Sequence, residues 1–327
     1  MTQTKTAAAA AERKNTASAA AKIKKFARRH EIQGYFWILP AFVLLVAFCY
    51  IPPVYALIYS FTDWGFIRKI SFVGFENYAN AFKDTLFWGS FGNVILFTVC
   101  GLVFGNLAAI ALSEMLYNMK REKLSAAFRY LFMLVCIVPG VVSVLVWEKV
   151  IFLPESSSLK GVANSLLGLI GLNGSQWYSS PETIKLTIIL TGFPWMGGTS
   201  FLIYLAGLQN IDPSVIEASK LDGLGSFKRI WYIDFPLMRG QLKYFLMTGF
   251  IGGLQNYSMQ LILQNGNAAM VPGFYIYKLG IEKVYTGNLD IYGCQGYACA
   301  LGMIMFAIIM IVTVVNNKFL KTTEGEK

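Results

Sequence analysis

EASKLDG, at residues 217–223, is a short polar stretch that stands between two long apolar runs. Asp212 and Pro213 can begin a helix ahead of it, because Asp is a favoured N-cap and Pro is tolerated at the first helical position. Gly223 can end the helix, since glycine accepts the left-handed conformation common after a helix. The stretch therefore predicts a short capped helix on a polar loop, suited to docking a partner rather than to catalysis.

The composition indicates a membrane protein. Of the 327 residues, 55% are hydrophobic and only 14% are charged, whereas a soluble domain carries about 25% charged residues. A bilayer core about 30 Å thick needs about 20 apolar residues per helix, and six runs approach that length. They are Phe36–Ser60, Asn93–Ser113, Tyr130–Trp147, Leu186–Leu208, Tyr244–Leu263 and Gly296–Asn316. The sequence thus predicts an all-α, polytopic, multi-pass membrane protein with six transmembrane helices.

Lys and Arg residues predict the orientation, because cytoplasmic segments carry an excess of them. If the N-terminus is cytoplasmic, the basic arm 1–34, the connection after the second run, the loop 209–243 and the C-terminal tail 321–327 lie on the same side. The formal net charge of +10 then falls entirely on that side, and the opposite connections are neutral. Both termini and the EASKLDG loop are therefore expected in the cytoplasm. This orientation explains the basicity, so nucleic acid is not expected as a partner.

Metal and redox chemistry have little support in the sequence. The chain has one His, His30, which lies in the basic arm, so no group of residues has the context of a metal site. Cys294 and Cys299 could form a disulfide if their segment were a loop. The alternative is that both act as small apolar residues near the start of a helix.

The polar loop carries the pattern E-A-S, three residues, Gly, and later Phe235-Pro236. This resembles the EAA loop of permease subunits of ATP-binding-cassette importers, which reads E-A-A, three variable residues, G, and then a hydrophobic residue and L-P. Ser219 and Phe235 depart from that pattern. Leu39-Pro40-Ala41, Gly74–Tyr78 and Ala206–Gln209 extend the resemblance over most of residues 35–320, closest to carbohydrate-uptake permeases.

The resemblance implies a type I importer permease fold over residues 35–320, in the cytoplasmic membrane of a bacterium. It implies that the chain is not an enzyme and binds no cofactor itself, with ATP and Mg held by partners. The implied partners are a second homologous permease, two ATP-binding cassette ATPase subunits, an extracytoplasmic solute-binding protein, a sugar substrate and the lipid bilayer.

The source of energy can be argued from the residues alone. The six runs contain no Asp, Glu, Lys, Arg or His, whereas proton-driven carriers usually place a carboxylate in the membrane. The chain also lacks the G-x-x-x-x-G-K-[ST] loop that cradles ATP phosphates. A transporter with neither feature needs a partner to supply energy. The alternative, which the sequence leaves open, is an ion-coupled carrier or a channel that works without an ATPase.

The docking residues are expected at the EASKLDG helix itself. Charged side chains would form ion pairs with an ATPase, and small residues would allow its close approach. The predicted coupling residues are Glu217, Ala218, Ser219, Lys220, Asp222 and Gly223. No catalytic or metal-binding residue is predicted.

The substrate pathway is expected in the fourth and fifth runs, which contain glycine, proline and polar residues. Broken helices near the membrane midplane are where transporters often bind substrate. Aromatic rings and amides also suit a sugar, although the same side chains could simply join helices. The predicted pathway residues are Trp195, Thr199, Gly249, Gly252, Gly253, Gln255, Asn256 and Tyr257. The predicted function is the permease of a sugar or oligosaccharide importer.

Overall fold

The structure is a computed structural model, and it describes residues 35–65, 70–155, 159–195, 198–263, 267–281, 284–286, 289–291 and 294–321. The basic arm 1–34 and residues 322–327 of the tail lie outside the described residues. Contacts divide the chain into one unit over residues 1–58 and a second over residues 59–327.

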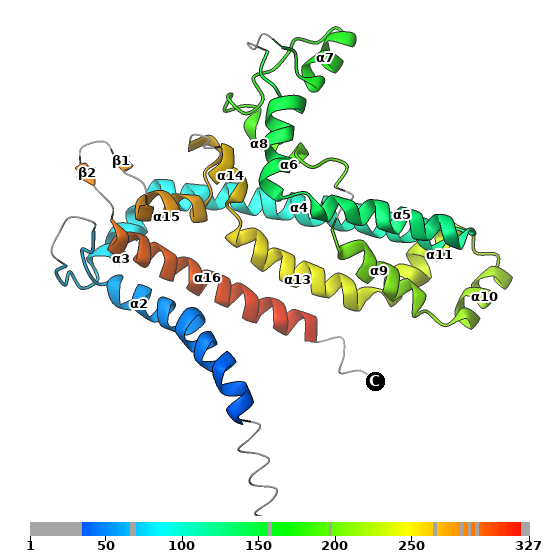
Figure 1. Cartoon of the computed structure of the whole chain (residues 1–327), viewed down its shortest axis with the longest axis horizontal. Coiled ribbons are helices and arrows are strands. Elements are labelled where there is room, and N and C mark those ends of the chain that lie inside the picture. Colours follow the sequence, from blue (N-terminus) through cyan, green and yellow to red (C-terminus); the bar gives the residue numbers. More distant parts are fainter. Residues whose placement is uncertain are drawn as a thin grey trace, which may run out of the picture. The chain divides into compact units, whose positions relative to one another are not determined.

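Helices make up nearly all of the described regular structure (Figure 1). The α-helices are α2 (Ile51–Tyr59), α3 (Glu76–Lys83), α4 (Thr85–Tyr117), α5 (Glu122–Leu134), α6 (Gly140–Val146), α7 (Val162–Leu169), α8 (Ile184–Leu190), α9 (Ser200–Gln209), α10 (Pro213–Leu221), α11 (Ser226–Arg229), α12 (Phe235–Leu237), α13 (Arg239–Gln255), α14 (Ser258–Leu263), α15 (Pro272–Ile281) and α16 (Gln295–Lys321). Short π and 3₁₀ turns are η1 (Val46–Tyr50), η2 (Val135–Ile137), η3 (Trp147–Ile151), η4 (Ile230–Asp234) and η5 (Asn267–Ala269). The strands β1 (Val284–Thr286) and β2 (Leu289–Ile291) form an antiparallel pair, so the all-α prediction holds apart from this hairpin.

Three helices in the described residues are long and apolar enough to cross a membrane. They are Tyr35–Tyr59, Thr85–Tyr117 and Gln295–Asn316, which correspond to the first, second and sixth predicted runs. A membrane helix must satisfy its backbone polar groups within its own segment, and an unbroken helix of this length does so. These three runs therefore form long apolar helices as predicted, while the six membrane crossings stay a prediction.

The other three predicted runs are interrupted. The third bends by 90° between Glu122–Ile137 and Gly140–Ile151, because Pro139 lies at the junction and proline cannot continue the hydrogen-bond ladder. The fourth run is divided into α8 and α9. The fifth is divided into α13 and α14 at Asn256, whose backbone is extended. Apolar composition alone therefore did not identify which runs form straight helices.

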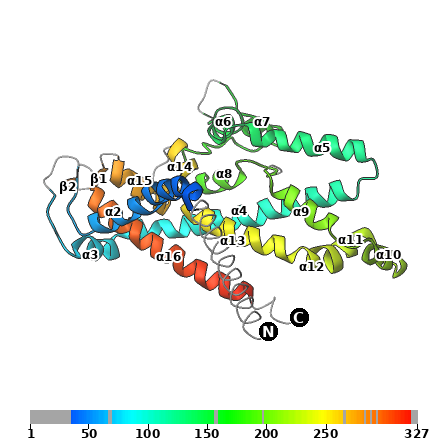
Figure 2. The ribbon, with the colours of Figure 1, turned by 60° about the horizontal axis from the view of Figure 1, so that its bottom comes forward.

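Helix α4 is the central element of the second unit, with α9 and α13 packed along it (Figures 1 and 2). One apolar core joins the first half of α4 to α15 and α16 through Phe87, Phe274 and Leu301. Another joins its second half to α9 and to Met238. Because both cores include α4, a displacement of this helix affects the packing at both of its ends.

Polar side chains of α4 also reach other elements. Asp84 caps the helix by accepting hydrogen bonds from the backbone N–H of Leu86 and Phe87, and its second oxygen accepts from the hydroxyls of Tyr275 and Tyr297, each at 2.8 Å. Further along, Asn93 donates to the carbonyls of Ala268 and Met270. Tyr204 of α9 donates to Asn106 at 2.6 Å, and Ser113 donates to the Phe201 carbonyl at 2.8 Å. These bonds fix α4 against α15, α16 and α9.

Candidate functional site

The docking helix predicted from EASKLDG is α10, and both of its caps are as expected. Asp212 accepts a hydrogen bond from the Ser214 N–H at 2.8 Å, with Pro213 at the start of the helix. Hydrogen bonding from Ser214 lowers the pKa of the Asp212 carboxyl, so the cap stays ionised. At the other end Gly223 has φ +73°, and the N–H of Leu224 bonds the Ser219 carbonyl at 3.0 Å. This is the Schellman arrangement that ends many helices.

The predicted coupling residues do not all face the same way. Glu217, Ala218, Lys220 and Asp222 are exposed, as docking requires. Ser219 is only 2% exposed, and its hydroxyl donates to the Ile216 carbonyl at 2.7 Å. In the described residues Ser219 therefore packs inward and presents no surface to a partner.

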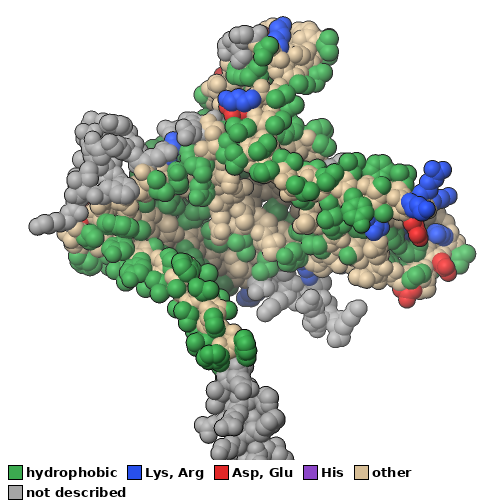
Figure 3. Space-filling model, in the orientation of Figure 1, with side chains coloured by type: hydrophobic (Ala, Val, Ile, Leu, Met, Phe, Trp, Pro, Cys, Tyr) green, Lys and Arg blue, Asp and Glu red, His purple; other side chains and the backbone are tan. Residues whose placement is uncertain are grey.

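Charged side chains gather at the end of the second unit formed by α10, α11 and the start of α5, while hydrophobic side chains cover much of the visible surface elsewhere (Figure 3). A helical protein in a bilayer has this distribution, because charged side chains avoid the hydrocarbon and collect at its boundary. The position of α10 at this charged end fits a loop that stands outside the membrane.

A buried ionic cluster, which the sequence did not indicate, connects this loop to α4. The Arg229 side chain donates to Asp234 at 2.9 Å and to Asn118 at 2.7 Å, and its Nη2 lies 3.8 Å from Glu114 Oε2. Glu114, Arg229 and Asp234 are 5%, 7% and 0% exposed. The second apolar run was predicted to end at Ser113, but α4 continues to Tyr117 and includes Glu114. Only the fold brings this carboxylate to an arginine distant in sequence.

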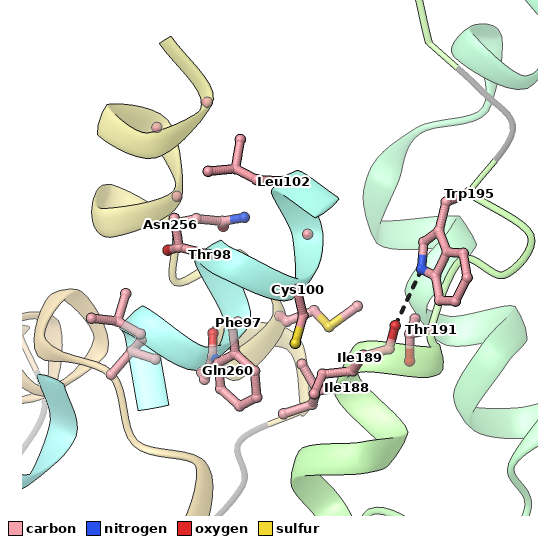
Figure 4. A pocket seen from close by; sticks show the side chains of 17 residues that line it. Phe97, Thr98, Cys100, Leu102, Ile188, Ile189, Thr191, Trp195, Asn256 and Gln260 are labelled. Atoms are coloured by element: carbon pink, nitrogen blue, oxygen red, sulfur yellow. Dashed lines mark hydrogen bonds between the residues drawn. The ribbon is translucent and has the colours of Figure 1, made fainter. Parts of the chain in front are cut away.

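A cavity of about 450 Å³ lies among α4, α8, α13 and the break after α8. Figure 4 shows Thr98 and Asn256 on one side of it and Trp195 on the other. The Trp195 ring stacks on Phe104 of α4, with centroids 4.7 Å apart, and its Nε1–H donates to the Ile189 carbonyl at 3.2 Å. The indole is therefore held in place at the edge of the cavity.

The cavity gathers five of the predicted pathway residues. They are Trp195, Gly249, Gly252, Gly253 and Asn256. Asn256 also accepts a hydrogen bond from the Ser258 N–H, so it begins α14 as well as facing the cavity.

Three predicted pathway residues lie elsewhere. Gln255 and Tyr257 line a separate groove of about 550 Å³ beside α15 and α16. Thr199 is an exposed residue at the start of α9 and is not among the residues that line the cavity. The side chains of adjacent residues where a helix breaks extend in different directions. The sequence alone did not show which direction each side chain would take.

Other residues of the cavity were not predicted. Thr98 and Cys100 come from α4, Thr191 from the end of α8, and Gln260 from α14. The Thr98 hydroxyl is buried and has no hydrogen-bond partner within the described part of the chain. Thr98 and Gly101 are three residues apart and share a helix face. This spacing could have predicted from the sequence that one face of α4 lines the cavity.

The three glycines of α13 have different surroundings. A Cβ atom at Gly249 would lie 2.6 Å from Leu102, and one at Gly253 would lie 2.5 Å from Thr98. A Cβ at Gly252 would meet nothing within 4 Å. Gly249 and Gly253 thus allow α13 to approach α4 closely, as small residues do between membrane helices, while Gly252 leaves open space.

Comparison with known proteins places the chain among transport components. Residues 101–322 match the family described as binding-protein-dependent transport system inner membrane component. The chain is 31% identical over 260 residues to the lactose transport system permease protein LacF of Rhizobium radiobacter, covering 77% of this chain and 84% of that one. It is 27% identical over 299 residues to the probable ABC transporter permease protein YesP of Bacillus subtilis, covering 90% and 93%.

A solved structure shares the fold. It is a crystal structure of a bacterial alginate ABC transporter in complex with alginate pentasaccharide-bound periplasmic protein. The matching chain has a TM-score of 0.75 at 20% identity, over 89% of this chain and 94% of that chain. The type I importer permease fold expected from the sequence is therefore supported across most of its length.

The contrast between the glycines of α13 predicts different effects of two single substitutions. Gly253→Ala should destabilise the protein by about 1–3 kcal/mol, because an added methyl group forces α13 away from Thr98. Gly252→Ala, the matched control, should stabilise the protein by up to about 1 kcal/mol, because its methyl group enters open space and alanine is favoured over glycine in a helix interior. Thermal unfolding in detergent measures both variants. Equal losses of stability would contradict the close contact at Gly253.

A second glycine pair tests the end of α10. Gly223→Ala should weaken the helix terminus by about 1 kcal/mol, since a left-handed conformation is unfavourable for alanine. Gly225→Ala is the control, because Gly225 lacks a positive φ and has equally open surroundings. Amide hydrogen exchange over residues 213–224 should become faster only in Gly223→Ala. Unchanged exchange in that variant would show that α10 does not end through this turn.

Proposed function

We propose that this chain, which belongs to the family of binding-protein-dependent transport system inner membrane components, is the membrane-spanning permease subunit of an ATP-driven importer of a sugar or oligosaccharide. The family is one of transport components, so the chain itself makes and breaks no covalent bonds. Its role is to open a pathway alternately to the two sides of the membrane. The work for this comes from a separate ATPase subunit.

The observation that carries the proposal is the continuity between α10 and the cavity. The loop that holds α10 is preceded by α9 and followed by α13, and α13 contributes Gly249, Gly252 and Gly253 to the cavity wall. Movement of a partner bound to α10 can therefore change the shape of the cavity through helices that are continuous with the loop. Glu217, Lys220 and Asp222 supply exposed charges for the partner to bind.

The implied assembly has a defined set of partners. We assign α10 to a cleft on one of two ATP-binding cassette ATPase subunits, which hold ATP and Mg, while this chain binds no cofactor. A second, related permease completes the membrane pathway. The solved alginate transporter contains a periplasmic protein that binds an alginate pentasaccharide, and this supports a solute-binding protein as the extracytoplasmic partner here.

The proposed topology has six membrane crossings in the cytoplasmic membrane of a bacterium, with both termini in the cytoplasm. The bent α5–α6 segment, the α8–α9 pair and the α13–α14 pair supply the three crossings beyond the continuous helices. Broken helices are acceptable in a membrane where the exposed backbone faces protein or a water-filled cavity. The cavity beside the breaks after α8 and α13 meets that condition.

A carbohydrate is the substrate class that the cavity fits best. Trp195 offers a flat apolar ring, while Thr98, Asn256 and Gln260 offer hydroxyl and amide groups. An uncharged sugar has both apolar C–H faces and hydroxyls, so it matches this combination. The lactose permease relative supports the same class.

The docking role predicts a charge-sensitive association. Co-purification of the complex in mild detergent should bring the ATPase subunits with the wild-type chain. Glu217→Arg should reduce the ATPase recovered and substrate uptake by at least about tenfold, because a reversed charge turns attraction into repulsion at the interface. Glu122→Arg, an exposed residue at the start of α5, is the control and should leave both unchanged. An unaltered yield and uptake in Glu217→Arg would overturn the docking role of α10.

The cavity predicts a separable effect at Trp195. Trp195→Ala should lower sugar uptake in proteoliposomes about tenfold by removing the ring, with ATPase co-purification unchanged. Trp195→Phe should retain most uptake, because it keeps an aromatic face. Full uptake by Trp195→Ala would remove this residue from the substrate pathway. A screen in which only amino acids or ions thermally stabilise the solute-binding protein would remove the carbohydrate assignment.

A further inference from the structure

The Arg229 cluster bridges two parts of the chain that the proposed function needs to move together. Arg229 ends α11 within the loop that carries α10, whereas Glu114 and Asn118 form the last turn and cap of α4. The guanidinium donates to Asn118 at 2.7 Å and to Asp234 at 2.9 Å. It also lies over the Tyr117 ring, 5.7 Å from the centroid. One side chain thus contacts Glu114, Tyr117 and Asn118 at the end of α4 as well as the loop's own carboxylate, Asp234.

The groups around the Arg229 guanidinium hold the contact between the loop and α4 in one geometry. A cation at a helix C-terminus is favoured by the helix dipole, and the planar fork of Arg can hold several acceptors in fixed directions. Asn118 also links Arg229 to Glu114, because its amide donates to the Glu114 carbonyl at 2.8 Å and to the Glu114 carboxylate at 3.1 Å. Glu114, Arg229 and Asp234 are all buried, so water molecules do not compete for the hydrogen bonds among them.

The cluster contains more carboxyl groups than basic groups. Two carboxylates face one guanidinium, and the remaining oxygens, Glu114 Oε1 and Asp234 Oδ1, are buried with no partner in the described residues. Removing the guanidinium would leave both carboxylates buried without a counter-charge, which is far more costly than replacing the whole cluster. Arg229 is therefore the basic group that holds Asp234 of the loop and the end of α4 in this arrangement.

Helix α4 connects this junction to the cavity. The same helix contributes Thr98, Gly101 and Leu102 to the cavity wall, about three turns or more before Glu114. Thr98 and Leu102 are also the residues against which Gly253 and Gly249 of α13 pack closely. A displacement of the α4 end would thus act on the α4–α13 contact that shapes the cavity.

We infer that Arg229 is a positioning residue that locks the coupling loop to the end of α4, so that α10 and α4 move as one rigid body and pass the displacement of the docked partner to the cavity. This inference rests on the proposed function. It adds a second path by which movement of α10 reaches the cavity, through α4, besides the backbone that joins the loop to α9 and α13. Without the Arg229 contacts, α10 could still bind the ATPase, but a given movement of α10 would displace α4 by a smaller amount.

The first part of the test measures geometry. Spin labels at Ser214 of α10 and Met115 of α4, in a chain without its native cysteines, report the distance between the two elements by pulsed EPR. The wild-type background should give one narrow distribution that is the same before and after ATP trapping of the complex. Arg229→Lys keeps the charge but loses the fork, and should broaden the distribution. Lys123→Met, an exposed residue of α5, is the control and should leave it narrow.

The second part measures coupling in the reconstituted complex. Arg229→Lys should lower the substrate transported per ATP hydrolysed by about fivefold, with ATPase co-purification unchanged. The uncharged triple variant Glu114→Gln, Arg229→Met and Asp234→Asn removes the buried charges together, which avoids the folding defect expected of a single Arg deletion. It should also show a lowered transport ratio. Lys123→Met should keep the wild-type ratio.

Two outcomes would overturn the inference. A narrow, unchanged distribution in Arg229→Lys would show that the fork does not set the position of α10 relative to α4. A wild-type transport ratio in both cluster variants would show that the lock does not transmit movement. Failure of the proposed function is distinguishable, because then the wild-type chain would bring no ATPase, while the EPR distances in the isolated subunit would still report whether Arg229 fixes the loop.

Discussion

A polar group inside an apolar helix needs a partner within the protein, because the surrounding hydrocarbon offers none, and α4 is built around that requirement. Asp84 at its start accepts from two tyrosine hydroxyls. Asn106 and Ser113 bond α9, and Glu114 near its end meets Arg229. The partners lie on α15, α16, α9 and α11, so the hydrogen bonds and ion pairs of α4 also determine which elements surround it. The two apolar cores of the second unit that include α4 then fill the space between these polar contacts.

The same requirement explains where the chain can be irregular. The backbone between α8 and α9, and again between α13 and α14, leaves the helical ladder, and both breaks adjoin the cavity. Backbone groups that a helix would have satisfied can there face protein or water. The residues best suited to bind a sugar are therefore found where the helices cannot be continuous. Gly249 and Gly253 add a close contact between α13 and α4 next to the cavity, so a small shift of either helix alters the space available.

Two connections join the docking helix to the cavity. One is covalent, through the loop into α13, and the other is the buried Arg229 cluster, which reaches α4. A loop joined only by its backbone could absorb the movement of a partner by bending. An ionic junction that fixes the loop against the end of a long helix reduces that freedom, since Arg229 bonds Asp234 of the loop and Asn118 at the end of α4 at the same time. In the proposed function the exposed charges of α10 bind the partner, and the buried cluster of Arg229 transmits its movement to α4.

Local chemistry in the sequence was enough to predict several features. The caps of α10 at Asp212 and Gly223 and the helical character of the apolar runs depend on residues close together in the chain, and the structure confirmed them. The resemblance of the loop pattern identified the family. The sequence could not show which side of a helix break Gln255, Asn256 and Tyr257 would face, that Ser219 packs inward, or that α4 extends past Ser113 to bring Glu114 to Arg229. Those outcomes depend on contacts between residues far apart in sequence. Hydrophobic periodicity and caps determine where helices form, but the direction of each side chain is decided only when the helices pack against one another.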